Sequence, residues 1–210
     1  MKKIIWLIVM ALPLVAFSKG TVDAKYLAGG VPEKNNVVTF SKSFTVENKS
    51  KDEIVSALSS YMNNLTKSAI ESQRTRMISD GSEDGTVVAK VEEYMVFTKK
   101  ALNFDRTRFR YQISAAVEGN TVNVTLSQVS YYYNEDMEGN NGITYKAEEW
   151  ITDKEALNSK GTKLLPRSKK FRIKTIDRVE AIFNSILDVF DTNKDAKTGE
   201  NIRGGVKVVK

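Results

Sequence analysis

The chain has no cysteine and no histidine. Without cysteine it forms no disulfide, and without histidine it lacks the base of the Ser-His-Asp and Cys-His nucleophile systems. The usual zinc sites also need these two residue types. The sequence contains no Ser-x-x-Lys, no G-x-G-x-x-G and no P-loop. Carboxylates, lysine and tyrosine remain for catalysis, so we expect a protein that is not an enzyme and holds no metal or cofactor.

Long apolar runs are scarce, and the clearest one lies at the start of the chain. A basic Met1–Lys3 precedes Ile4–Phe17, which carries no charge, and Ala16 and Ser18 place small residues where cleavage before Lys19 requires them. This is the layout of a secretory signal peptide. The run of about 14 residues is shorter than the roughly 20 of a membrane-spanning helix. We therefore expect removal of residues 1–18 and an exported protein, periplasmic or extracellular, with an uncleaved anchor as the alternative.

An excess of one charge is also lacking. The sequence has 32 basic and 26 acidic residues, a net charge of +6, which becomes +4 without Lys2 and Lys3. A charge this small favours solubility rather than binding to a polyanion, so we expect no nucleic-acid partner. The oligomeric state cannot be deduced from this composition.

The apolar pattern predicts a single domain over residues 37–190, after an extended lead-in at 19–36. Alternating apolar residues predict a strand at 37–46 and several antiparallel strands between residues 74 and 133. In the last of these the alternation changes phase after Leu126, which indicates a β-bulge near Ser127 and Gln128.

Two helices are predicted by apolar residues at helical spacing. The first follows a capping box formed by Ser50 and Glu53, and the second has its apolar stripe between Ile176 and Phe190. Residues 191–210 lack such a pattern and are expected to form a loose tail. The order of strand, helix, several antiparallel strands and helix predicts an α+β fold, in which both helices pack on one face of a curved sheet.

Six short segments carry a resemblance to a known family: Tyr26–Pro32, Val38–Lys42, Glu92–Phe97, Arg106–Arg108, Tyr145–Ile151 and Lys170–Arg178. In this order they resemble the secreted bacterial family called domain of unknown function 4468. The resemblance covers about residues 26–190 and implies a TATA-binding-protein-like fold of a sheet with two helices. It implies no activity, ligand or catalytic residue, and the fold label by itself implies no DNA binding.

Three arginines form the first candidate ligand-binding group. Arg106, Arg108 and Arg110 alternate with apolar residues and therefore share one face of a predicted strand. Paired guanidinium groups bind phosphate or carboxylate. The alternative is a solvated face, or an edge strand that charge protects from aggregation.

Lys42 and Glu93 form the second candidate group, because each interrupts an otherwise apolar strand face. Two buried charges of opposite sign are expected to pair. A functional interpretation makes Glu93 an activated acid, whereas the structural one makes the two residues a salt bridge or turns both to water through bulges.

Two further patterns favour structural interpretations. Three consecutive tyrosines, Tyr131–Tyr133, could form a stacking platform with Trp150, but neighbouring strand residues point to opposite faces, so packing is the better account. The spacing of Asp191, Asn193 and Asp195 imitates a calcium loop. The sixth and twelfth positions lack the required glycine and glutamate, so no metal site is expected.

The sequence thus favours an exported binding domain without enzymatic activity. We expect it to bind a protein, a peptide or an envelope component such as a glycan through the exposed face or edge of its sheet. One alternative is a glycan hydrolase in which Glu93, Glu148 or Glu149 acts as acid or base. The other is a purely structural module of the cell envelope.

Signal cleavage can be tested directly. The N-terminal sequence of the protein recovered from its native cell is expected to begin within a few residues of Lys19, because Ala16 and Ser18 fit the cleavage site. Recovery of an intact Met1 end from the membrane fraction would contradict export as a cleaved protein.

Overall fold

The computed structural model describes residues 22–100, 103–135, 141–191 and 206–208. The predicted signal peptide, and the calcium-like segment after Asp191, lie outside these residues. No helix in the described part of the chain has the length and apolar content to cross a membrane.

Most of the strands form one antiparallel sheet of seven. They are β3 (Phe40–Val46), β4 (Arg76–Asp80), β5 (Thr86–Lys100), β6 (Asn103–Glu118), β7 (Thr121–Tyr133), β8 (Ile143–Lys146) and β9 (Val206–Val208). Their order is β4-β5-β6-β7-β3-β9, and β8 pairs with the second half of β7. Two short strands, β1 (Glu33–Lys34) and β2 (Val37–Val38), form a separate hairpin.

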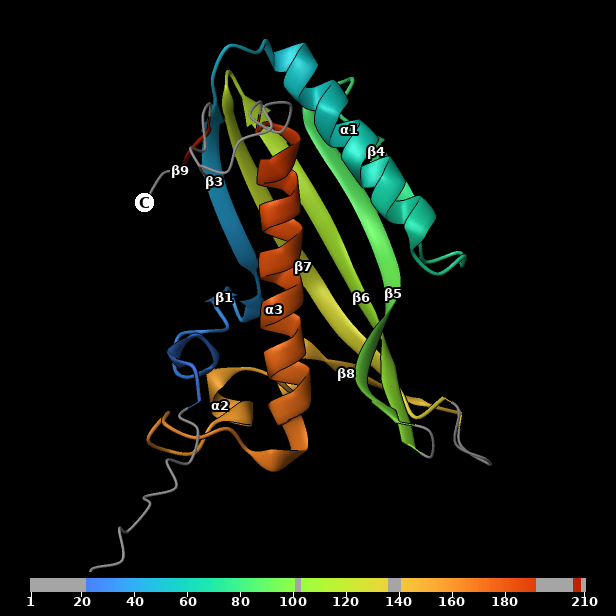
Figure 1. Ribbon diagram of the computed structural model, residues 1–210, viewed down its shortest axis with the longest axis vertical. Helices are drawn as coiled ribbons and strands as arrows, with labels where there is room; N and C mark the ends of the chain where they lie inside the picture. Colours follow the sequence, from blue (N-terminus) through green and yellow to red (C-terminus); the bar gives the residue numbers. More distant parts are fainter. Residues whose placement is uncertain (1–21, 101–102, 136–140, 192–205, 209–210) are drawn as a thin grey trace, which may run out of the picture.

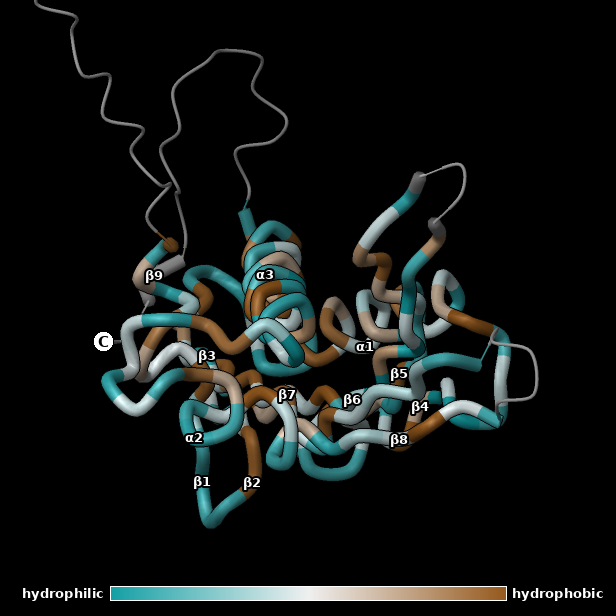
Figure 2. Tube along the Cα trace, turned by 90° about the horizontal axis from the view of Figure 1, so that it is seen from below, coloured by the Kyte–Doolittle hydropathy of each residue, from teal (hydrophilic) through white to brown (hydrophobic). Residues whose placement is uncertain are grey.

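The main helices are α1 (Lys51–Ser68) and α3 (Pro166–Val189), and both lie on the same face of the sheet (Figure 1). Three shorter helical segments join them: η1 (Ala24–Tyr26), η2 (Ala147–Glu149) and α2 (Asp153–Ala156). Seen along its length, the sheet has α1 and α3 above β5, β6 and β7 (Figure 2). The face of β4 to β7 turned away from these two helices is called the open face below. The predicted α+β class with two helices on one sheet face is confirmed.

The core lies between the sheet and the two helices. Every apolar residue of the stripe predicted between Ile176 and Phe190 is buried, as are Phe44, Phe109 and Leu126 on the sheet. The last helix is longer than its stripe, since it begins at Pro166, where proline fits the first helical turn because that turn needs no donor.

Two local predictions are confirmed. At the start of α1 the Ser50 hydroxyl accepts a hydrogen bond from the Glu53 N–H, and the Glu53 carboxylate accepts one from the Ser50 N–H at 2.8 Å. On β7 the register against β6 shifts between Ser127 and Ser130, and Gln128 has φ of 54°. Gln128 is therefore part of the predicted β-bulge.

The chain end differs from the expected loose tail. Val206–Val208 form β9, which pairs antiparallel with Phe44–Val46 of β3. Valines suit an added edge strand because their branched side chains fit a pleated surface. Their lack of helical spacing is no sign that they fail to pair.

A buried arginine joins three segments at the end of the sheet near β8. The Arg172 side chain, 0% exposed, donates hydrogen bonds to the carbonyls of Tyr26, Leu27 and Ile151 and to the Asp153 carboxylate. These bonds connect η1 and the start of α2 to α3. An arginine can make all of them because its guanidinium carries five donors in a fixed plane.

The Arg172→Met substitution is expected to destabilise the fold by about 3–5 kcal/mol, because it removes the donors of several buried acceptors. Urea unfolding followed by circular dichroism measures the change. Arg167→Met is the matched control on the same helix, since the Arg167 side chain is 60% exposed and is expected to contribute less than about 1 kcal/mol. Equal losses for the two variants would contradict a central role of Arg172.

Candidate functional site

The open face of β6 carries the three arginines selected from the sequence. Arg106, Arg108 and Arg110 alternate with Thr107, Phe109 and Tyr111, which are buried. Because neighbouring strand residues point to opposite faces, the three arginines lie together on the side without helices. The structure thus brings them onto one surface, as their spacing predicts.

Each of these arginines has a different neighbour. The Arg106 guanidinium lies 4.0 Å from the centre of the Tyr94 ring. Arg108 forms an ion pair with Glu135 at 2.5 Å, and Arg110 forms one with Glu92 at 2.6 Å. The charges of Arg108 and Arg110 are therefore balanced within the chain, so the row by itself is not a strong anion site.

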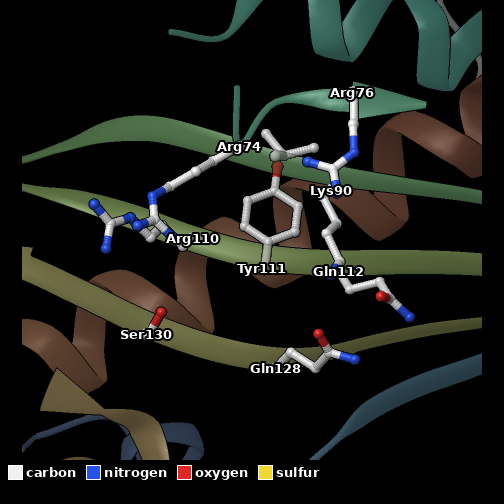
Figure 3. A pocket seen from close by; sticks show the side chains of 9 residues that line it. Arg74, Arg76, Lys90, Arg110, Tyr111, Gln112, Gln128 and Ser130 are labelled. Atoms are coloured by element: carbon white, nitrogen blue, oxygen red, sulfur yellow. The ribbon is translucent and has the colours of Figure 1, made fainter. Parts of the chain in front are cut away.

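A hollow of about 250 Å³ opens next to Arg110 (Figure 3). It is called the basic hollow below. Arg74 and Arg110 lie on one side of it, and Arg76 and Lys90 on the other (Figure 3). The residues that line it are Arg74, Arg76, Lys90, Val91, Arg110, Tyr111, Gln112, Gln128 and Ser130. Four of them are basic and none is acidic.

The basic hollow lies where the sheet is irregular on both sides. On one side, β4 begins at Arg76, which pairs with Lys90 of β5, so both side chains share the open face. On the other side, the bulge at Gln128 places an extra residue opposite Tyr111. Bulges interrupt pairing and redirect side chains, which accounts for a depression in an otherwise continuous strand surface.

A buried carboxylate beside the basic hollow compensates one of its charges. Glu92 is 1% exposed and accepts hydrogen bonds from Arg110 at 2.6 Å and from the Ser72 hydroxyl at 2.7 Å. Burial alone would raise the pKa of Glu92, but the bonds from Ser72 and Arg110 hold it below its usual value. Glu92 is therefore ionised at neutral pH and balances Arg110.

The other three cations of the basic hollow have no acidic partner among the described residues. Arg76 donates to the Gln73 carbonyl at 2.6 Å, and neither Arg74 nor Lys90 forms an ion pair. A cluster of like charges repels itself unless an anion lies between them. The arrangement can therefore bind a carboxylate, phosphate or sulfate group.

The predicted pairing of Lys42 with Glu93 is wrong. Both residues lie on the helix side of their strands, but β7 and β6 lie between β3 and β5. Glu93 instead accepts two hydrogen bonds from Arg178 of α3, both 2.7 Å long. This carboxylate raises the pKa of Arg178. The available signal for this partner was Arg178, the one arginine between Ile176 and Phe190 in the sequence.

The tyrosine run divides over the two faces, as its position on a strand requires. Tyr131 is buried, and its hydroxyl lies 2.7 Å from that of Thr175. The Tyr133 hydroxyl donates to Asp105 at 2.9 Å, whereas Tyr132 lies on the open face beside Arg110. The three rings form no common platform.

The carboxylates of the hydrolase alternative lie on two elements, with Glu148 and Glu149 on η2 and Glu93 on β5. Glu148 accepts a hydrogen bond from the Val38 N–H at 2.8 Å, and Glu149 is exposed on η2. Glu93 lies beside α3 in the salt bridge with Arg178. Within the described residues, no three His, Cys, Asp or Glu side chains are grouped in a way that could hold a metal ion.

Sequence reasoning missed Arg74, Arg76 and Lys90, although they supply most of the charge of the basic hollow. Arg74 lies in a turn, and β4 is only 5 residues long. Neither segment has the repeated alternation that marked the arginines of β6. The available signal was the spacing of Arg74 and Arg76, which lie two residues apart like the arginines of β6.

Known proteins resemble this chain over most of its length. A family described as "Domain of unknown function (DUF4468) with TBP-like fold" matches residues 40–132. The crystal structure of a DUF4468 family protein from Bacteroides ovatus ATCC 8483 has 34% sequence identity and a TM-score of 0.73, covering 80% of this chain and 95% of that one.

A second solved structure, a TBP-like protein from Parabacteroides distasonis ATCC 8503, has 23% identity and a TM-score of 0.63. It covers 77% of this chain and 97% of its own, and at this identity it shows the fold alone. No curated protein matches the chain.

The salt bridge between Glu93 and Arg178 gives a double-mutant test. Glu93→Gln and Arg178→Met are each expected to destabilise the fold, with a coupling energy of about 0.5–3 kcal/mol, because the two residues act as one unit. Urea unfolding of both single variants and the double variant measures it. Lys42→Met is the control and is expected to show no coupling to Glu93→Gln. Coupling of Glu93 to Lys42 instead would contradict the observed pairing.

Proposed function

The chain belongs to the DUF4468 family, whose description gives a fold and no activity. We propose that it is an exported binding domain without enzymatic activity. Its open face holds an acidic group of a protein, a peptide or an envelope component. The observation that carries this proposal is the basic hollow on the open face, where Arg74, Arg76 and Lys90 have no acidic partner among the described residues.

The chemistry of the basic hollow supports an anionic ligand. Arg74, Arg76 and Lys90 provide guanidinium and ammonium donors within one depression of about 250 Å³. Guanidinium groups bind carboxylate or phosphate through two parallel hydrogen bonds, which gives both strength and orientation. Gln112 and Gln128 add neutral donors beside these cations.

The surface next to the basic hollow supports a macromolecular partner. Tyr94, on β5, is 40% exposed, and the rings of Tyr94 and Tyr132 lie on either side of Arg108, at 5.8 and 5.9 Å from its guanidinium. Tyrosine and arginine are enriched where proteins bind one another, since both combine an apolar area with hydrogen-bond donors. The row formed by Tyr94, Arg108 and Tyr132 thus extends the charged site into a wider contact surface.

Export rests on the N-terminal sequence. The basic start, the short uncharged run and the small residues before Lys19 support secretion through a cleaved signal peptide.

Binding of an acidic probe tests the proposal. Fluorescein-labelled hexaglutamate is expected to bind the mature protein, and the double substitution Arg74→Gln/Lys90→Gln is expected to weaken binding at least tenfold. The affinity is also expected to fall as salt is added, because exposed charges are screened. Fluorescence anisotropy at two salt concentrations measures both effects.

Lys160→Gln/Lys163→Gln is the matched control, since it removes the same charge from the exposed loop before α3. It is expected to change the affinity by less than about twofold, because exposed charges more than a Debye length apart are screened from each other. Equal weakening by both double variants, or no binding of the probe to the unmodified protein, would refute a specific acidic site.

A further inference from the structure

The second half of β5 is an edge of the sheet without a neighbouring strand. β4 pairs with β5 only as far as Lys90, whereas β5 continues to Lys100 with β6 on its other side. After Lys90 the chain between α1 and β4 touches this edge at one residue. The Glu92 carbonyl accepts from the Ile70 N–H at 2.9 Å, and the Glu92 N–H donates to the Thr75 hydroxyl at 3.0 Å.

These two bonds show which backbone groups point outward. Since the N–H and C=O of Glu92 point away from β6, those of Tyr94 and Val96 do so as well, because strand geometry repeats every two residues. No described residue hydrogen-bonds with the outward groups of Tyr94 and Val96. These groups are called the free edge below. Neither residue is a lysine or a proline, the residues that commonly protect an edge strand.

A groove lies beside the free edge on the helix side of the sheet. Its volume is about 390 Å³, and it is lined by Glu93–Val96 of β5 and by Lys174, Asp177, Arg178 and Ala181 of α3. Figure 1 shows the second half of β5 continuing past the end of α1. The groove therefore has a strand edge as one wall and α3 as the other.

We propose that the free edge binds an extended segment of a partner protein, in which apolar and acidic residues alternate, as an added antiparallel strand. The free backbone groups of Tyr94 and Val96 supply the hydrogen bonds, as in other cases of strand addition. Antiparallel pairing matches every other pair of strands in this sheet.

The two sides of the added strand meet different surroundings. A partner residue opposite Tyr94 shares the open face with Arg74, which lines the basic hollow and forms no ion pair among the described residues. An acidic side chain suits that side. The partner residues before and after it point into the groove, toward Met95 and Ala181. Small apolar side chains suit that side, and this alternation defines the partner's chemistry.

This site shares Arg74 with the basic hollow, but its backbone hydrogen bonds do not rest on the proposed function. The basic hollow binds an anion through side chains on the open face, whereas the free edge binds through backbone groups of β5. A test that alters only backbone hydrogen bonds can therefore separate the two.

The probe is a labelled, N-acetylated ten-residue peptide that alternates valine and glutamate. In antiparallel pairing, the residue opposite Tyr94 directs its N–H and C=O toward β5, and its side chain lies on the same face as Tyr94. N-methylation of the glutamates is therefore expected to weaken binding at least tenfold, while N-methylation of the valines changes it by less than about twofold. Fluorescence anisotropy measures all three peptides against the mature protein.

A protein variant tests the same bond from the other side. Val96→Pro removes the outward N–H and leaves the bonds between β5 and β6, because proline lacks a donor only at its own position. It is expected to weaken binding of the unmethylated peptide at least fivefold. Val96→Ala, which keeps the N–H, is expected to change the affinity for this peptide by less than about twofold. Thermal unfolding checks that both variants are folded, and the methylated peptides provide the test if Val96→Pro is not.

Three outcomes would overturn strand addition: no binding, equal weakening by both methylation patterns, or binding that depends on Arg74 and Lys90 but not on methylation. The last outcome would place the peptide in the basic hollow. Conversely, the expected methylation pattern together with no binding of hexaglutamate would support the free edge and refute the proposed function.

Discussion

The burial of Arg172 is the constraint on which one end of the structure depends. A guanidinium is costly to remove from water unless its nitrogens are hydrogen-bonded, and here all three nitrogens donate, to the carbonyls of Tyr26, Leu27 and Ile151 and to Asp153. Those carbonyls belong to short segments that have little apolar surface of their own. Arg172 therefore stabilises these segments in place of apolar packing, because it satisfies their buried acceptors and fixes them to α3 at the same time.

The two faces of the sheet differ in how their charges are compensated. On the helix side, Phe171, next to Arg172, packs edge-on against Phe97, Tyr131 and Tyr133. Several charges on this side are paired, as between Lys170 and Asp105 or between Arg178 and Glu93. On the open face water reaches the side chains, so cations such as Arg74 and Lys90 can remain without partners at little cost to stability.

Local features of the fold could be predicted from the sequence, and long-range pairings could not. The capping box at Ser50 and the bulge at Gln128 depend on residues close together in the chain, so spacing alone is sufficient to find them. Alternation also placed Lys42 and Glu93 on the correct side of their strands. It could not give their partners, because these depend on strand order, and β6 and β7 separate the two residues. The partner of Glu93 comes instead from a helix 85 positions away.

The candidate sites show the same limit for a different physical reason. Alternation identified Arg106, Arg108 and Arg110 because a long strand repeats its pattern, yet only Arg110 lines the basic hollow. The free edge exists because β4 has 5 residues whereas β5 has 15. A difference in length becomes an unpaired edge only when the two strands are known to be neighbours in a given register. Both sites therefore arise where the regular sheet ends or shifts, and there the periodic signal in the sequence is weakest.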